Sequence, residues 1–236
     1  MTRDWVRWHD GYEDPASGLS TRLALVQAHV SAALATAPAG PIRLVSLCAG
    51  QGRDVIGVLP GHPRLADVSA LLVELDPVNA RVASDGAAAA GLTGVTVREA
   101  DAGVVTTYAD VLPADVLLLC GIFGNVSDED IRQTAAAAAA MCAKDGTVIW
   151  TRHRRPPDLT GQIRSWFATA GFDEVAFDVP ATATMTGVGV HRLRAAAPPA
   201  GLPGGRLFTF RPDRGQAGPG QAPGTAGLAA GGQAPA

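Results

Sequence analysis

The 236-residue sequence has few cysteines, few aromatic residues and no long apolar run, and each shortage excludes a class of protein. Its three cysteines, at positions 48, 120 and 142, form neither a disulfide framework nor a zinc-type spacing, so we expect no metal site. The longest apolar run, Val116 to Phe123, is far too short to cross a bilayer, and the first residues lack the apolar stretch of a secretory signal. We therefore expect a cytoplasmic protein without a membrane partner.

An excess of charge of one sign is also absent. The chain has 19 lysines and arginines against 22 acidic residues, a formal net charge of -3 at pH 7. This balance, together with the lack of a basic stripe, argues against nucleic acid as a partner. Hydrophobic residues make up 47% of the sequence, which is enough to fill the core of one α/β domain and excludes global disorder.

Short apolar segments alternate with helical patterns along most of the chain. Turn and capping residues separate them, as Asp76, Pro77 and Gly91 do around one expected helix. The expected strands are 42–48, 69–75, 95–98, 115–120, 147–151 and 172–179, and the expected helices between them are 53–59, 77–90, 128–143 and 156–170. This alternation predicts an α/β fold, a Rossmann-like doubly wound sheet that is mostly parallel, with helices on both faces.

A seventh strand is expected near the end of this pattern, and two segments compete for it. They are Val188 to Leu193 and Arg206 to Phe210, of which we favour Leu207-Phe208-Thr209-Phe210. The final strands have no helix between them, so the last strand is expected to be antiparallel.

Composition divides the chain into three expected parts. Residues 1–40 form an N-terminal helical segment, with a helix over 20–35, that can act as a lid. Residues 41–211 form the α/β domain. Residues 212–236 are rich in glycine, proline and alanine, and are expected to be a disordered tail because they cannot bury enough apolar surface.

Acidic residues follow consecutive strands at the sheet edge where ligands bind in doubly wound folds. The first strand ends in a turn that contains Gly50 and Gly52, which let the backbone approach a ligand closely. Glu74 ends the second strand, where its carboxylate can accept hydrogen bonds from both hydroxyls of a ribose. Asp101 lies just beyond the third strand, where it can accept from an adenine amino group. The series predicts a nucleoside site.

This series resembles the class I S-adenosylmethionine-dependent methyltransferases over roughly residues 42–210. The resemblance implies S-adenosylmethionine as cofactor and a set of residues around it: Cys48, Ala49, Gly50 and Gly52 at the methionine part, Glu74 at the ribose, Asp101 and Ala102 at the adenine, and Cys120 beneath the sulfonium. The front segment with Trp8, His9 and Tyr12 looks like that of actinobacterial members of this group.

Two positions depart from the usual pattern of that family. The family has an acid where Ser46 stands and a glycine where Cys48 stands. Without the acid at Ser46, binding of the cofactor's amino group would use Asp54 or water instead.

Two other functions remain open. A dinucleotide fingerprint of the form G-x-G-x-x-G needs a third glycine at position 55, which is Val55, so an NAD(P)-dependent oxidoreductase is the weaker alternative. A non-catalytic protein that binds S-adenosylmethionine or a partner is the other, because the departures leave no unambiguous base.

Candidate catalytic groups come from two places in the sequence. His9 and Tyr12 precede the N-terminal helix, and His153 follows the fifth strand among three arginines. A histidine at the ligand edge can remove a proton from the methyl acceptor. The arginines can clamp an acidic substrate group, although a solvated charge run explains them more simply. We expect methyl transfer to oxygen or nitrogen of a small molecule.

Overall fold

The computed structural model describes residues 5–180, 183, 185–194, 202 and 204–211. The expected tail, 212–236, lies outside the described residues. The described chain forms one seven-stranded sheet in the order β3-β2-β1-β4-β5-β7-β6. Strands β1 to β5 run parallel to one another, whereas β7 is antiparallel to both of its neighbours, β5 and β6. The expected mostly parallel sheet with a reversed last strand is confirmed.

The first four strands lie within one or two residues of their expected positions. The strands are β1 (Ile42–Leu47), β2 (Val68–Glu74), β3 (Val95–Glu99), β4 (Ala114–Leu119), β5 (Cys142–His153), β6 (Phe172–Asp178) and β7 (Thr186–Leu193). Strand β1 pairs with both β2 and β4, so the order of the strands reverses at β1: β2 and β3 follow on one side, and β4 and β5 on the other. Ligands bind at such a point in doubly wound sheets.

The described helices are α1 (Trp5–Trp8), α2 (Gly18–Thr36), α3 (Arg53–Ile56), α4 (Pro77–Ala89), α5 (Asp128–Met141) and α6 (Thr160–Thr169). Three of them, α2, α4 and α5, begin directly after a residue whose side chain caps them. Asp76 accepts hydrogen bonds from the first amides of α4, and Ser127 and Asp130 form a capping box on α5. No described helix is long and apolar enough to cross a membrane.

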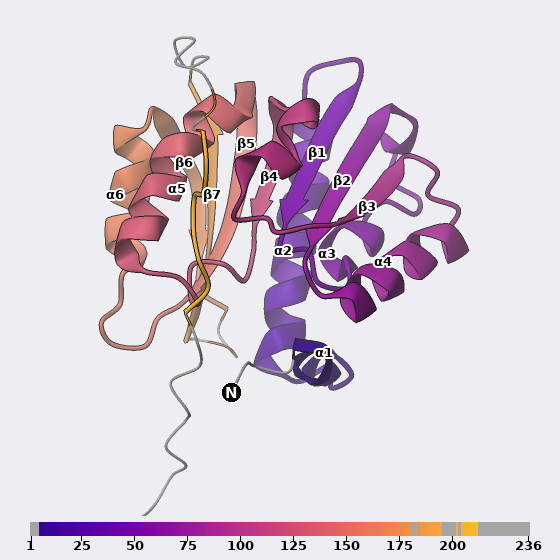
Figure 1. Ribbon diagram of the computed structural model, residues 1–236, viewed down its shortest axis with the longest axis horizontal. Coiled ribbons are helices and arrows are strands. Elements are labelled where there is room, and N and C mark those ends of the chain that lie inside the picture. The colour runs from indigo at the N-terminus through magenta and orange to yellow at the C-terminus, as the bar shows by residue number, and fades with distance from the viewer. Residues whose placement is uncertain (1–4, 181–182, 184, 195–201, 203, 212–236) are drawn as a thin grey trace, which may run out of the picture.

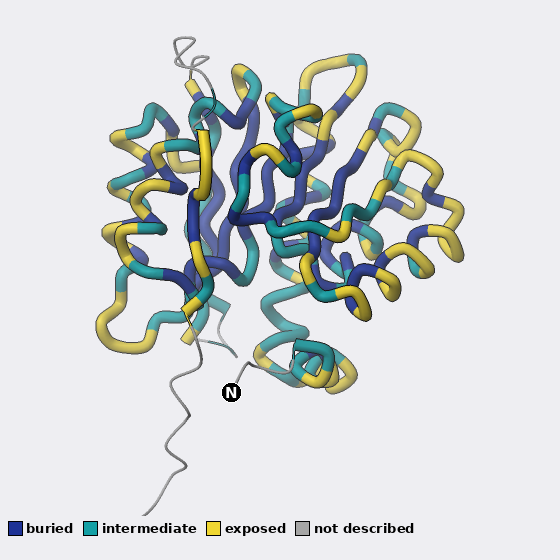
Figure 2. The backbone as a smooth tube through the Cα atoms, viewed as in Figure 1, coloured by how far each residue is buried: buried dark blue, intermediate teal, exposed yellow. Residues whose placement is uncertain are grey.

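Helices cover the two faces of the sheet and bury a separate core on each (Figure 1). Helices α5 and α6 pack on one face through residues such as Ile131 and Phe167. Helices α2, α3 and α4 pack on the other, where Val30 and Leu34 of α2 are fully buried. The inner strands β1, β2, β4, β5 and β7 are buried along most of their length, as Figure 2 shows, whereas the edge strands β3 and β6 are mostly half-buried or exposed. Burial on both faces explains why β1, β2 and β4 are nearly continuous apolar runs.

The expectation for the seventh strand was wrong, because β7 is formed by Thr186–Leu193 and not by Leu207–Phe210. Gly189 pairs with Trp150 of β5, and a Cβ atom there would lie 2.2 Å from the indole. The large core residue on β5 therefore requires glycine in the strand beside it. The 207–210 segment runs outside the sheet, on the side of α5 (Figure 1), where Leu207 and Phe208 are buried.

Candidate functional site

A cavity of about 680 Å³ lies at the carboxyl ends of β1, β2, β4 and β5. Helix α1 and the following 3-10 turn, His9–Tyr12, lie beyond these strand ends (Figure 1) and contribute Trp5, Trp8, His9 and Tyr12 to its wall. The cavity is thus built where the sequence predicted a ligand site.

The turn after β1 needs left-handed backbone at three positions. Gly50 and Gly52 have φ angles of +57° and +68°, and Cys48 has +55°. A Cβ atom on Gly52 would lie 2.6 Å from Leu72, so this glycine allows the turn to pack on β2. Cys48 adopts a conformation that favours glycine, at the position where the resemblance led us to expect one.

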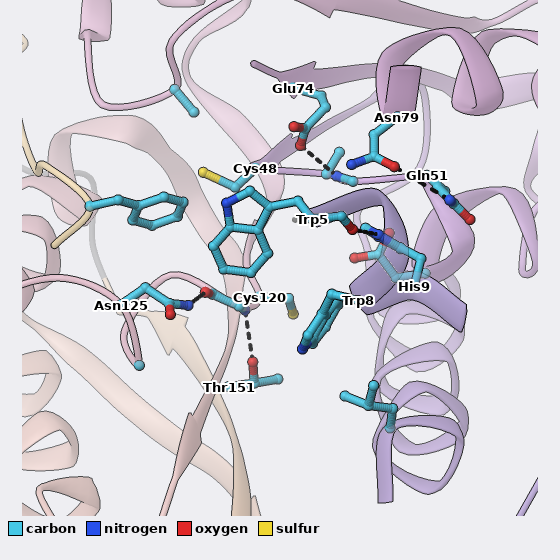
Figure 3. Close-up of a pocket in the computed structure, with 18 of the residues that line it drawn as sticks. Trp5, Trp8, His9, Cys48, Gln51, Glu74, Asn79, Cys120, Asn125 and Thr151 are labelled. Carbon is cyan, nitrogen blue, oxygen red and sulfur yellow. Dashed lines mark hydrogen bonds between the residues drawn. The ribbon is translucent and has the colours of Figure 1, made fainter. Parts of the chain in front are cut away.

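Glu74 and Asp101 line the same cavity, as the strand-edge argument requires. The Glu74 carboxylate accepts hydrogen bonds from the amides of Gly50 and Asp76, both at 2.8 Å, which fixes it against the glycine turn (Figure 3). Asp101 accepts from the Gly103 amide and pairs with Arg206 at 2.8 Å. Each acid is held in place by backbone and keeps lone pairs for further donors.

Two buried polar atoms at this end of the cavity have no hydrogen-bond partner among the described residues. One is Asp54 Oδ1, and burial raises the pKa of this carboxyl to about 6. The other is Nδ2 of Asn79, whose Oδ1 accepts from Gln51 at 3.3 Å (Figure 3). Buried polar groups are normally hydrogen-bonded, so both point to a ligand.

Asn79 was not among the residues predicted for the site, although the sequence contains a signal for it. It is a polar residue on the buried face of α4, where Ala80, Ala83 and Ala87 are also buried. A polar side chain within an apolar helical stripe either has a partner in the fold or faces a site.

His9 lies directly against the glycine turn. A Cβ atom on Gly50 would lie 2.5 Å from His9 Nε2, so glycine allows this contact. His9 Nδ1 is 2.7 Å from the Trp5 carbonyl oxygen, which only accepts, so Nδ1 carries the proton and Nε2 keeps its lone pair. Burial lowers the pKa of His9, which keeps the ring neutral at pH 7.

Tyr12 lines the cavity as a protonated phenol. Its oxygen accepts a hydrogen bond of 2.7 Å from Arg22, whose guanidinium also lies 5.4 Å from the centre of the Trp8 ring. Burial raises the pKa of Tyr12 above its ordinary value of 10.0. Tyr12 is therefore suited to hold or orient a ligand and not to remove a proton at neutral pH.

The other end of the cavity follows β4 and β5. Gly121 donates its amide to Thr151 Oγ1 at 2.9 Å, and its carbonyl accepts from Asn125 at 2.6 Å (Figure 3). These bonds hold the loop after β4 against the end of β5. Cys120 lies in the wall beside them.

Arg152 and His153 extend from the end of β5 into this part of the wall. Arg152 is only 8% exposed and donates one hydrogen bond to the Phe123 carbonyl, while its Nε is buried without a partner among the residues that the structure describes. The simpler interpretation as a solvated charge run was therefore wrong for Arg152. The buried Nδ1 of His153 likewise has no hydrogen-bond partner in the described ranges, and burial lowers the pKa of this histidine.

Residues 204–211 complete the wall from the other end of the described chain. The Leu207 amide donates to Gly103 and the Arg211 amide donates to Asn125, which holds the segment against the loops after β3 and β4. Phe208 and Phe210 line the cavity, and the Phe210 ring lies 5.9 Å from that of Trp5. Residues 207–210, which were predicted to form the seventh strand, instead form part of the cavity wall.

The structure brings together nearly all candidate site residues. The cavity is lined by His9, Tyr12, Cys48, Ala49, Gly50, Glu74, Asp101, Ala102, Cys120 and His153. Gly52 is the exception, because it is buried behind the turn against Leu72 and Ile56. The roles given to these residues stay predictions.

Comparisons with known proteins agree with this geometry. Residues 16–165 match the model of a family described as "Putative methyltransferase". No curated protein matches the sequence at a significant level. Among solved structures, an O-methyltransferase family protein from Burkholderia thailandensis is similar with a TM-score of 0.58 and 17% identity over 75% of this chain.

Magnesium protoporphyrin IX methyltransferase from Synechocystis PCC 6803, solved with bound SAM, is similar with a TM-score of 0.60 and 14% identity. This match covers 80% of this chain and 90% of that protein, whereas the chain spans 58% of the Burkholderia protein. At these identities the structural matches show the shared fold. The family model spans more than half of the chain, so the chain belongs to this methyltransferase family, which confirms the class I methyltransferase expected from its sequence.

Proposed function

We propose that this chain binds S-adenosylmethionine and transfers its methyl group to an oxygen or nitrogen of a small molecule. One observation carries the proposal: Glu74, Asp101 and the glycine turn, which come from three different strand ends, line a single cavity. Membership of a methyltransferase family and the shared fold support the same reaction.

The residues of the β1–β3 end fit the chemical groups of this cofactor. Asp54 offers an unpartnered carboxylate oxygen to the cofactor's ammonium group. Glu74 and Asn79 together offer acceptors and an amide donor to the ribose hydroxyls, and Asp101 offers an acceptor to the adenine amino group. When bound, S-adenosylmethionine supplies an electrophilic methyl group on a sulfonium and leaves as a neutral thioether.

The protein's part in the transfer is to position the acceptor and to take its proton. A bond from the acceptor oxygen or nitrogen to the methyl carbon forms as the carbon–sulfur bond breaks, and the acceptor loses one proton. We assign this proton to His153, because it lies at the β5 end of the cavity with a neutral ring at pH 7. His9 lies against the cofactor turn and is the second candidate.

Calorimetric titration with S-adenosylhomocysteine tests the cofactor site. We expect Glu74→Gln to weaken binding about tenfold or more, because it removes a charged acceptor. Glu99→Gln is the matched control, because Glu99 pairs with Glu74 in register on β3 but is exposed and outside the cavity. Equal binding by both variants would contradict the proposed site.

The same titration separates the other two functions. Binding of NAD in place of S-adenosylhomocysteine would favour an oxidoreductase. Binding of S-adenosylhomocysteine without turnover of any acceptor would favour a non-catalytic binding protein. The cytoplasmic location stays a prediction.

The pH dependence of kcat at saturating cofactor tests the base. A base must be neutral to accept a proton, and the pKa of His153 lies below its ordinary value of 6.5. We therefore expect kcat to stay constant above pH 6.5 and to fall only at a more acidic pH, where His153 becomes protonated. His153→Gln should lower kcat by about 100-fold or more and remove this acid limb. An unchanged pH profile in the variant would assign the proton to another group.

A further inference from the structure

Carboxylates of the described chain line only one end of the cavity, whereas arginines line both ends, with Arg53 and Arg206 beside the carboxylates. The acidic side chains of the wall, Asp54, Glu74 and Asp101, all belong to the end formed by β1, β2 and β3. The end formed by β4 and β5 has Arg152, His153 and Arg155 in its wall and no carboxylate among the lining residues that the structure describes. The end left for the methyl acceptor is thus cationic.

Arg152 is the central group of this cationic end. Its guanidinium is buried, it donates to one backbone carbonyl, and Nε has no partner in the described part of the chain. Asp128 and Asp158 favour its charged form from a distance, but neither forms an ion pair with it; Asp158 pairs with Arg154. A buried cation without a counter-ion is costly, so such a group in a cavity wall indicates an anionic ligand.

The neighbours of Arg152 limit the charge that this ligand carries. His153 is neutral at pH 7 because burial and the nearby arginines lower its pKa. Arg155 is exposed at the rim and forms no ion pair with a described residue. One buried guanidinium matches one carboxylate, which it can hold with two parallel hydrogen bonds.

Flat apolar surfaces face the same space. The rings of Trp5, Trp8, Phe208 and Phe210 line the cavity, and Trp5 lies 6.0 Å from Trp8 and 5.9 Å from Phe210. In the view of Figure 3, Trp5 lies between Cys48 and Asn125. Such walls favour a planar ring, because aromatic pairs gain energy beyond their buried area.

From these observations we propose that the methyl acceptor is an aromatic carboxylic acid, whose carboxylate is held by Arg152 and Arg155 while its ring packs against Trp5 and Phe210. This inference rests on the proposed function for the identity of the other ligand. It adds the acceptor's chemical class and two specificity-determining arginines. A guanidinium-bound carboxylate is a weakened nucleophile, so a hydroxyl or amine on the ring is the methylated group.

Calorimetric titration of the protein saturated with S-adenosylhomocysteine tests the acceptor class. The probes are benzoate and salicylate, each compared with its neutral amide, benzamide or salicylamide. We expect each acid to bind about tenfold or more tightly than its amide, as for a charge-assisted hydrogen-bonded pair. Acids that bind no more tightly than the amides overturn the inference.

Variants of the arginines locate the effect. Arg152→Met should abolish the preference for the acids, and Arg155→Gln, at an exposed position, should reduce it by about twofold to fivefold. Arg81→Gln removes an exposed arginine of α4 outside the cavity and should leave the preference unchanged. A preference that survives in Arg152→Met also overturns the inference.

Binding of S-adenosylhomocysteine to each variant separates this inference from the proposed function. Retained binding shows that Arg152→Met is folded and that its cofactor site is intact. If the wild-type protein fails to bind S-adenosylhomocysteine, the proposed function is wrong. If it binds S-adenosylhomocysteine but does not distinguish acids from amides, only the acceptor class is wrong.

Discussion

Asp54 shows how a single residue can favour ligand binding while it lowers the folding stability of the protein without ligand. Its carboxyl is buried with an unpartnered oxygen, and its pKa rises from 3.8 to about 6. The folded chain therefore binds more protons than the unfolded chain between these values, and stability falls as the pH rises through this range. At pH 7 the buried carboxylate destabilises the protein that has no ligand.

We expect Asp54→Asn to raise the free energy of unfolding at pH 7 by about 1–3 kcal/mol, because the neutral amide removes the buried charge. The gain should shrink towards zero near pH 3, where the wild-type carboxyl is mostly protonated in both the folded and the unfolded state. Denaturant unfolding at both pH values measures this difference. Asp85→Asn, at an exposed position of α4, should show no such gain.

The same variant should bind S-adenosylhomocysteine less tightly by about tenfold, because the amide offers no charge to the ammonium group. A variant that is more stable and binds normally would show that Asp54 does not contact the cofactor. For the wild-type protein, we expect cofactor affinity to fall as the pH drops below about 6, where Asp54 becomes protonated.

For single residues, the sequence predicted which side chains lie at the strand ends, but it did not predict how far each of them is buried. Glu74 and Asp101 could be placed because parallel strands end at a common edge. Arg152 could not, because the run Arg152 to Arg155 has the composition of an exposed loop. Only the continuation of β5 through His153 shows that its first arginine is buried.

Among the elements, β7 depends on two glycines that face large rings. A Cβ atom at Gly187 would lie 2.7 Å from Phe177, and one at Gly189 would lie 2.2 Å from Trp150. Glycine weakens strand propensity, which is why the sequence favoured the aromatic 207–210 segment instead. Residues 186–193 form the strand because they fit against Trp150 and Phe177 of the neighbouring strands. Trp150 is distant in sequence, so this fit could not be read from the local pattern.

We expect Gly189→Ala to lower the free energy of unfolding by about 1–3 kcal/mol, because the added methyl group overlaps the Trp150 indole in a closely packed core. Gly161→Ala in α6 meets nothing within 4 Å and should raise stability slightly, by up to about 0.5 kcal/mol. Thermal or denaturant unfolding of both variants compares them. If Gly189→Ala were as stable as the wild-type protein, β5 and β7 would have to shift apart at this point at little cost in free energy.

Helices were predicted more accurately than the last strands because their signals are local. Asp76 caps α4 as expected, and Ser127 caps α5, whose expected start at residue 128 is confirmed. The helix expected over 53–59 is shorter, since α3 ends at Ile56, and that expected to open at 156 begins at Thr160. Capping residues fix where a helix starts, whereas tertiary packing decides how far it continues.

For the whole molecule, the site depends on segments from both ends of the described chain. Residues 5–12 and 204–211 lie outside the sheet and meet where Trp5 contacts Phe210. Because both segments line one cavity, we expect S-adenosylhomocysteine with benzoate to slow amide hydrogen exchange in both segments together. The strands β1 and β4 should show little change. Protection confined to the glycine turn would contradict this shared role.

All carboxylates of the described cavity wall lie at the β1–β3 end, which Arg53 and Arg206 also line, whereas the β4–β5 end has only basic and neutral groups, so the electrostatic potential becomes more positive towards β5. A positively charged methyl donor is attracted to the acidic end and a negatively charged acceptor to the basic end, so each ligand enters in one orientation. Methyl transfer removes the positive charge from sulfur. The acidic end therefore holds the spent donor less strongly than the fresh one, which favours product exchange after every turnover.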